Sequence, residues 1–260
     1  PALGSAAALG GNKDLVIDGA APGVGNVTSP TADGAYKAGD TVLITVQLSE
    51  SVVVAGGTPT LELETGATDR AATYVSGSGT DTLVFSYTVQ PGDSTGDLDY
   101  ASTTPIALNG ATVTDTAGNP ADLTLAAPGT PGSLGANKAI AIDTTIPVVT
   151  AVTATNADGT YIPGDVITLT VAFSENVTVS GTPTLQLETG ATDRQATYTA
   201  GSGTNTLTFT YAVQPGDQTA DLEALATNAL ALAGGAIKDA ASNDAILTLP
   251  ALGSAGSIGG

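Results

Sequence analysis

Residues Gly57–Asp93 read GTPTLELETGATDRAATYVSGSGTDTLVFSYTVQPGD, and Gly181–Asp217 repeat them in register as GTPTLQLETGATDRQATYTAGSGTNTLTFTYAVQPGD. Large apolar residues at alternate positions are kept between the copies, while the residues between them change. The kept residues are Leu83, Phe85, Tyr87 and Val89, matched by Leu207, Phe209, Tyr211 and Val213. Such alternation is typical of a strand with one buried and one solvated face. The stretch therefore predicts a chain built from two copies of one all-β unit.

The repetition continues outside this stretch and sets the expected domain limits. Pro1–Gly11 (PALGSAAALGG) match Pro250–Gly260 (PALGSAGSIGG), and Asn12–Asp18 (NKDLVID) match Asn137–Asp143 (NKAIAID). We therefore expect residues 1–20 to be the trailing strand of a preceding repeat and a possible donor strand. The first repeat is expected at 21–143. The second is expected at 144–260, without its own copy of the NKxxxID strand.

The periodic segments are rich in Val, Ile, Thr and Leu, and Gly and Pro punctuate them. Seven or more short strands per repeat, separated by turns, indicate an immunoglobulin-like β-sandwich. The expected fold class is thus all-β, with tandem immunoglobulin-like β-sandwich domains. One predicted inward face comprises Val42, Ile44, Val46 and Leu48, and its counterpart comprises Ile167, Leu169, Val171 and Phe173.

The strands expected in the first repeat are 23–28, 41–48, 52–54, 58–63, 72–74, 83–89, 106–114, 123–125 and 139–142, with a further strand at 13–18 before it. A turn is expected at Ser49–Glu50. The stretch closest to a helix is Asp221–Leu232, but its counterpart contains Pro105. Because proline interrupts a helix, we expect a loop there.

Charge and composition exclude several functions. Six Lys plus Arg stand against 25 Asp plus Glu, giving a formal net charge of −19. So few cations form no basic patch, which excludes nucleic acid as a partner and disfavours an anionic membrane surface. No apolar run approaches the length of a membrane span.

Enzymatic chemistry is also disfavoured. The chain contains no Cys or His, so it has neither a Ser–His–Asp nor a Cys–His arrangement. A hydrolase that uses a carboxylate pair is kept as a third alternative. The candidate acids recur in turns of both repeats, which suits structure better than a single active site. We expect that the protein is not an enzyme.

Acidic residues recur at equivalent positions near strand ends, and this points to calcium. Calcium prefers six to eight hard oxygen ligands. The alternative is that these residues only form turns, since Asp and Asn bond nearby backbone N–H groups. The predicted metal-binding residues are Asp18, Asp40, Glu50, Asp93, Asp97, Asp115, Asn119, Asp143, Asp165, Glu175, Asp217, Asp221, Asp239 and Asn243.

A repeated Asp–Arg pair, Asp69–Arg70 and Asp193–Arg194, is a further candidate. We expect a salt bridge or a packed arginine stem there, with a binding determinant as the alternative.

The motifs IDTTIP, ADGxYxxGD, FSExVxVxGxPxLxLETG, GSGTxTLxFxYxVQPGD and DxAGNxAxLTL occur in order and together. They lie at Ile142–Pro147, Ala157–Asp165, Phe173–Gly190, Gly201–Asp217 and Asp115–Leu125. Their combination resembles the tandem immunoglobulin-like repeats of large bacterial surface proteins and adhesins. The resemblance implies an exported, extended array at the bacterial cell surface, often rigidified by calcium. The second repeat departs from the pattern at Asp239–Asn243, where DAASN replaces DTAGN, so the resemblance supports its calcium site less than the first.

The ends of the sequence allow two interpretations. Residues 1–260 are either a window cut from a longer covalent array, or a subunit that lends its first strand to a neighbouring copy and builds a filament. Against strand exchange, residues 1–11 duplicate 250–260, so both cannot follow one path.

The function that these observations indicate is a structural repeat of a secreted or cell-surface protein, in a stalk, matrix filament or surface layer, stiffened by calcium. The alternative is a module that binds a glycan or a protein through loops at one pole, around Tyr100–Pro105 and Ala224–Asn228.

Overall fold

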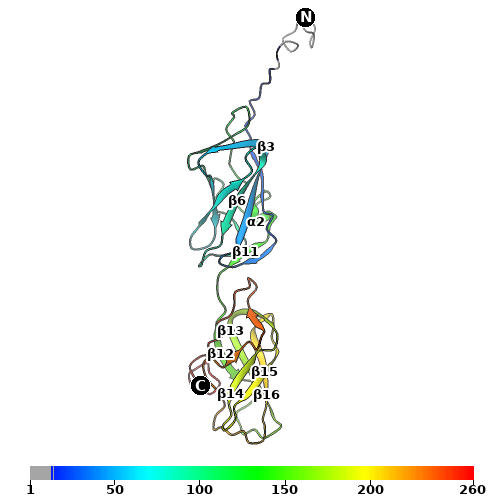
Figure 1. Cartoon of the computed structure of the whole chain (residues 1–260), viewed down its shortest axis with the longest axis vertical. Helices are drawn as coiled ribbons and strands as arrows, with labels where there is room; N and C mark the ends of the chain where they lie inside the picture. The colour runs from blue at the N-terminus through cyan, green and yellow to red at the C-terminus, as the bar shows by residue number, and fades with distance from the viewer. Residues whose placement is uncertain (1–12, 14) are drawn as a thin grey trace. The chain divides into compact units, whose positions relative to one another are not determined.

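The computed structural model describes Lys13 and residues 15–260 (Figure 1). The chain divides into two compact units. The first contains the residues up to Gly34, together with Gly39–Val89 and Thr95–Ala141, and the second contains Ala35–Ala38, Gln90–Ser94 and Ile142–Gly260. The predictions made for residues 1–12 and 14 lie outside the described residues.

The first repeat consists of short strands and one single-turn helix. These are β1 (Val24–Thr28), β2 (Gly34–Tyr36), β3 (Thr41–Gly56), β4 (Thr60–Glu64), β5 (Arg70–Ser76), β6 (Thr80–Thr88), β7 (Ser94–Thr95), β8 (Asp99–Tyr100), β9 (Ile106–Ala107), β10 (Ala111–Thr114), α2 (Leu134–Asn137) and β11 (Ile140–Asp143).

The second repeat contains strands at the corresponding positions. These are β12 (Val149–Ala154), β13 (Val166–Ser180), β14 (Thr184–Glu188), β15 (Arg194–Ala200), β16 (Thr204–Ala212), β17 (Glu223–Ala224), β18 (Leu230–Ala231) and β19 (Ala236–Lys238).

Both repeats form the same antiparallel sheet. Its strand order is β1-β3-β6-β5-β4-β8 in the first repeat, where β9 also pairs with β4 and β10 with β3. The second repeat follows it as β12-β13-β16-β15-β14-β17, with β18 on β14 and β19 on β13. Figure 1 shows β3 beside β6, and the register places Val42 opposite Tyr87 just as it places Ile167 opposite Tyr211. The predicted all-β fold is confirmed.

The first repeat contains a second, three-stranded sheet in the order β2-β11-β7. Within the described residues, the second repeat forms no corresponding sheet. The alignment of the repeats explains the difference, since Gly260 is the counterpart of Ala136, which precedes β11.

The core is made by the predicted inward faces. Each of the eight residues predicted on β3 and β13 is at most 4% exposed. Phe85 and Phe209 are fully buried, and each forms an edge-to-face contact with a tyrosine, Tyr74 at 5.9 Å and Tyr198 at 5.8 Å between ring centroids. Such contacts add to the hydrophobic energy of burial. One predicted core residue differs between the copies, because Val89 is buried and Val213 is only half-buried.

The turn predicted at Ser49–Glu50 is wrong, because β3 runs unbroken through it. The register with β6 shifts between Gln47 and Val52. A β-bulge of this kind bends a strand without ending it, so β3 pairs first with β1 and β6 and then with β10. Polar residues that suggested a turn therefore mark a bulge.

Other strand predictions need smaller corrections. The strand expected at 106–114 is two strands, β9 and β10, separated by a turn in which Asn109 (φ 51°) and Gly110 (φ 82°) are left-handed. The segment 123–125 forms no strand. The short helix α2 was not predicted; its N-cap is Ser133, whose hydroxyl accepts a hydrogen bond from the Ala136 N–H.

The strand expected at 13–18 is not formed by its described residues. Leu15, Val16 and Ile17 are instead exposed by 68%, 85% and 97%. Within the described part of the chain, no helix is long and apolar enough to cross a membrane.

Candidate metal centres

Three predicted acidic residues of the first repeat meet in one cluster. The carboxylate oxygens of Asp18, Glu50 and Asp115 all lie within 4.8 Å of one another. Asp18 precedes β1, Glu50 lies at the bulge of β3, and Asp115 directly follows β10. The bulge is therefore what brings the Glu50 carboxylate to the same end of the repeat as the other two.

The second repeat builds the same cluster from the counterpart residues Asp143, Glu175 and Asp239, again within 4.8 Å. The second repeat has DAASN where the first has DTAGN, and the loss of this glycine does not prevent the cluster from forming. Ser242 adopts a positive φ of 68° where Gly118 has 95°. A left-handed serine is strained, but the turn keeps its shape. The cluster therefore forms in both repeats.

An asparagine holds each cluster together. The Asn243 side-chain amide donates hydrogen bonds to Asp239 Oδ2 at 2.7 Å and to the Asp143 carbonyl oxygen at 3.0 Å. Asn119 does the same in the first repeat, with Asp115 Oδ2 at 2.7 Å and the Asp18 carbonyl oxygen at 3.2 Å. Both asparagines were predicted as ligands. Their amide N–H groups fix the position of a carboxylate and of the chain segment before the first strand, and their role as metal ligands stays a prediction.

The electrostatics of the second cluster are unfavourable without a cation. Burial raises the pKa of the Glu175 carboxyl, and the nearby Asp143 and Asp239 raise it further. Its Oε1 atom is buried and has no hydrogen-bond partner within residues 15–260. A buried polar atom without a partner destabilises the fold, so this carboxylate calls for a proton or a positive ion.

The pKa of Asp115 is shifted in the opposite direction, below its usual value. Burial would raise its pKa, but hydrogen bonds from the Asn119 side chain and from backbone N–H groups of the turn outweigh burial and hold the pKa below its usual value. Asp115 is therefore kept ionised beside the other two acids. An ionised, hydrogen-bonded carboxylate is well suited to bind a metal ion.

The remaining predicted ligands lie outside both clusters. Asp93 Oδ2 accepts a hydrogen bond from the Gln90 N–H at 2.9 Å, and Asp165 Oδ2 accepts one from the Ile162 N–H at 2.8 Å. Each thereby closes its own turn, which is the alternative role considered for these acids. Asp40 lies in the turn before β3.

Asp97 and Asp221 lie next to a second acid that the sequence did not single out. Asp97 is close enough to Asp99 for that charge to add to the effect of burial, and both raise the Asp97 pKa. Glu223 follows Asp221, and its Oε2 accepts hydrogen bonds from Gly253 N–H at 3.1 Å and Gly259 N–H at 3.2 Å. Burial of Glu223 opposes these bonds, yet they leave its pKa lowered. These hydrogen bonds to Glu223 anchor the residues near Gly260.

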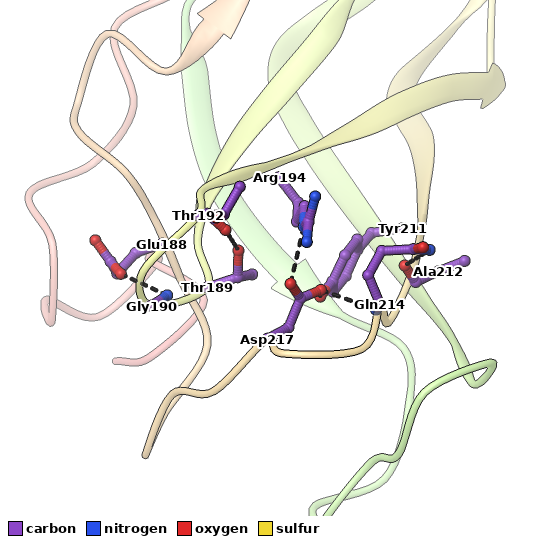
Figure 2. Close-up of polar contacts among 9 residues, drawn as sticks. All are labelled: Glu188, Thr189, Gly190, Thr192, Arg194, Tyr211, Ala212, Gln214 and Asp217. Carbon is purple, nitrogen blue, oxygen red and sulfur yellow. Dashed lines mark hydrogen bonds and ion pairs between the residues drawn. The ribbon is translucent and has the colours of Figure 1, made fainter.

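Asp217 has a different partner, which Figure 2 shows. Its Oδ1 forms an ion pair with Arg194 Nε at 2.8 Å, and its Oδ2 accepts hydrogen bonds from the Tyr211 hydroxyl and the Gln214 N–H. The salt bridge predicted for this arginine is therefore present, but it does not join the sequence neighbours Asp193 and Arg194. The Asp217 side chain is only 4% exposed, and these contacts occupy both of its oxygens.

This ion pair predicts an acid-sensitive step in stability. Burial would raise the Asp217 pKa, but bonds from Tyr211 and Arg194 and the Arg194 charge keep it below its ordinary value. A lowered folded pKa stabilises the fold above the unfolded pKa of about 3.9, and this stability is lost as the pH falls through the folded value.

We therefore expect Asp217→Asn to be less stable than wild type near pH 7, with the gap closing below about pH 4. Denaturant unfolding at a series of pH values measures this. Asp193→Asn removes the same charge next to the arginine and serves as the control. A gap that stays constant with pH would contradict the assignment.

The region suggested for a ligand-binding pocket has a structural role in the first repeat. Tyr100 is 1% exposed and its hydroxyl donates to the Ala126 carbonyl oxygen at 2.6 Å. In the second repeat, a groove of about 550 Å3 lies elsewhere, between residues 157–161 and 217–222.

Comparison with known proteins adds no assignment: no family model matches the chain, and no curated protein matches it.

Proposed function

We propose that this chain is a structural repeat of a secreted or bacterial cell-surface protein. Its tandem immunoglobulin-like β-sandwiches form an extended stalk or fibre, and calcium bound at the two carboxylate clusters stiffens each repeat. The role is mechanical, and no catalytic step is assigned to it.

The observation that carries the proposal is the recurrence of one cluster in both repeats. Each cluster joins an aspartate of the segment that leads into the first strand, the bulge of the longest strand and the turn after a short strand. A cation there would tie three separate segments together at the point where the chain enters the repeat. That location is where a stalk most needs resistance to bending.

The chemistry of the clusters fits calcium in particular. Only oxygen ligands are present, and the chain contains no Cys or His to favour zinc or another soft metal. Asp18, Glu50 and Asp115 would hold one ion, and Asp143, Glu175 and Asp239 the other. Glu175 Oε1, buried and without a hydrogen-bond partner among the described residues, supports the presence of a cation. Bound calcium would neutralise the repulsion within each cluster.

The immunoglobulin-like assignment is supported by several features of each repeat. Short antiparallel strands of equal order enclose an apolar core, and their inward residues alternate with solvent-facing ones. Because one core and one cluster belong to each repeat, the number of calcium sites would grow with the number of repeats.

We expect calcium to raise the thermal stability of the protein. A ligand that binds only the folded state adds about 2.7 kcal/mol at a concentration of 100 Kd. For repeats of this size the unfolding temperature would rise by roughly 5–15 °C relative to a chelator. Calorimetry in calcium, in magnesium and in chelator at equal ionic strength measures this. An unfolding temperature that is equal in calcium and chelator would overturn the proposal and leave the acids as turn formers.

A further inference from the structure

The outward side of the sheet in the first repeat contains apolar residues that the second repeat replaces with threonine. Leu43 on β3, Val75 on β5 and Val84 on β6 have the counterparts Thr168, Thr199 and Thr208. The inward-facing neighbours on β3 and β6 are buried and stay apolar in both repeats. Because the same sheet folds with threonine at the three outward positions, core packing does not explain their apolar character in the first repeat.

The three apolar side chains lie near one another. Leu43 pairs with Ser86 on β6, and Val84, two residues earlier on that strand, points to the same side of the sheet. Such diagonal neighbours are within reach of each other's side chains. Val75 is 53% exposed and precedes Ser76, which pairs with Val84. The three residues therefore form one apolar patch on the outside of the sheet.

The surroundings of this patch carry no charge. The outward positions next to it on the same three strands hold hydroxyl side chains. Patch and hydroxyl residues together are called the neutral face: Leu43, Thr45, Thr73, Val75, Val84 and Ser86. In a chain with a net charge of −19, two copies repel each other, and they can approach most closely where neither is charged. A cationic partner would instead gain its affinity from the carboxylates elsewhere on the chain.

The neutral face is also self-complementary. Its apolar side chains can pack against the same side chains of another copy, and its hydroxyl groups both donate and accept hydrogen bonds. A surface of this kind pairs with itself around a two-fold axis. Three strands offer less than the roughly 800 Å2 per partner that a stable complex buries, so a single contact is weak and reversible.

We propose that the neutral face of the first repeat pairs with the same face of a second copy of this chain. The contact joins chains side by side, which goes beyond the function proposed above for a single chain. It uses none of the carboxylates of the two clusters and therefore does not depend on calcium. In a dense layer of such chains, weak contacts of this kind reinforce one another.

The test gives the first repeat the residues of the second, in a variant that combines Val75→Thr and Val84→Thr. Threonine has nearly the shape of valine, and the second repeat forms the same strands with threonine at both positions. Sedimentation equilibrium from about 10 μM to about 1 mM, all in chelator, measures self-association. We expect wild type to approach the mass of a dimer. The variant should associate at least about tenfold more weakly, because each hydroxyl buried against an apolar surface loses hydrogen bonds to water.

Val166→Thr is the matched control. Val166 belongs to the second repeat and is 52% exposed, close to the 53% of Val75, and its counterpart in the first repeat is Thr41. The control therefore makes the same chemical exchange at equal exposure outside the neutral face, and it should leave association unchanged. Added salt should strengthen the pairing of wild type, since it screens the repulsion between anionic copies and leaves an apolar contact intact.

Three outcomes would overturn the proposal. Wild type could remain a single molecule up to the highest concentration, or Val166→Thr could weaken association as much as the double variant. Association could also disappear in added salt, which would assign it to ionic contacts. Denaturant unfolding of each variant shows whether it stays folded, so that a lost contact is distinguished from a lost fold. Because all measurements are made in chelator, the pairing and the calcium sites can fail independently.

Discussion

Glu175→Gln is expected to change the stability of the protein in opposite directions in calcium and in chelator. In chelator the variant should be more stable than wild type, because it removes one of three crowded acidic groups from a site where burial and two aspartates already raise the Glu175 pKa. In saturating calcium it should be less stable, because a ligand is lost. The loss would approach the stabilisation of about 2.7 kcal/mol that calcium adds at 100 Kd.

Denaturant unfolding in both conditions measures this inversion. Glu188→Gln is the matched control, since Glu188 is an exposed glutamate at a strand end, bonded to the Gly190 N–H outside the cluster (Figure 2). It should shift stability equally in calcium and in chelator. If Glu175→Gln behaves in the same way, the cluster binds no cation.

Gly77→Ala is expected to destabilise the first repeat by about 4 kcal/mol or more, an effect found only when a mutation has a specific structural cause. Gly77 has φ +113°, and a Cβ atom there would lie 2.0 Å from the Thr82 carbonyl oxygen. The opposing atom is backbone of β6 and has no rotamer with which to move aside. The hairpin between β5 and β6 would have to open.

Gly79→Ala is the control that separates the effect of the steric clash from the effect of the left-handed backbone conformation. Gly79 is also left-handed, at φ +85°, but a Cβ there meets nothing within 4 Å. Its substitution should cost only the local strain of about 1–2 kcal/mol. Chemical denaturation of the two variants gives the comparison, and equal losses would exclude the predicted clash. Gly201 and Gly203 repeat the contrast in the second repeat.

Strand positions were the part of the fold most open to prediction. The two repeats are two sequences that adopt one fold, and comparing them shows which positions must stay apolar. Positions that do, such as Leu83 and Phe85, identify the buried face of a strand. The bulge near Glu50 could not be distinguished from a turn, because both interrupt the alternation with polar residues. Only the pairing of β3 with β10 beyond that point shows that the strand continues.

The sequence predicted which types of residue form the candidate sites, but not which of the candidate acids meet in a cluster. The fourteen candidates comprise twelve acids and two asparagines, and six of the acids form the two clusters. Asp217 and Asp165 have the same turn-like surroundings in sequence and each closes its own turn, yet Asp217 also pairs with Arg194. Which acids meet depends on contacts between segments distant in the chain. The exposure of Val213 is likewise set by contacts outside its own segment. The sequences around Val213 and Val89 match, yet Val89 is buried and Val213 is half-buried.

The asparagine bridges have a mechanical consequence. Asn243 binds both the Asp239 carboxylate and the carbonyl oxygen of Asp143, the residue that enters the repeat and also contributes a carboxylate to the cluster. A pulling force on that entering segment would act directly on the cluster. Tension and cation occupancy would then be linked reciprocally, since a cation that resists displacement of the segment must bind less tightly when the segment is displaced. If the clusters bind calcium as proposed, a repeat under load would hold its ion less tightly, and would bind it more tightly again as the load falls.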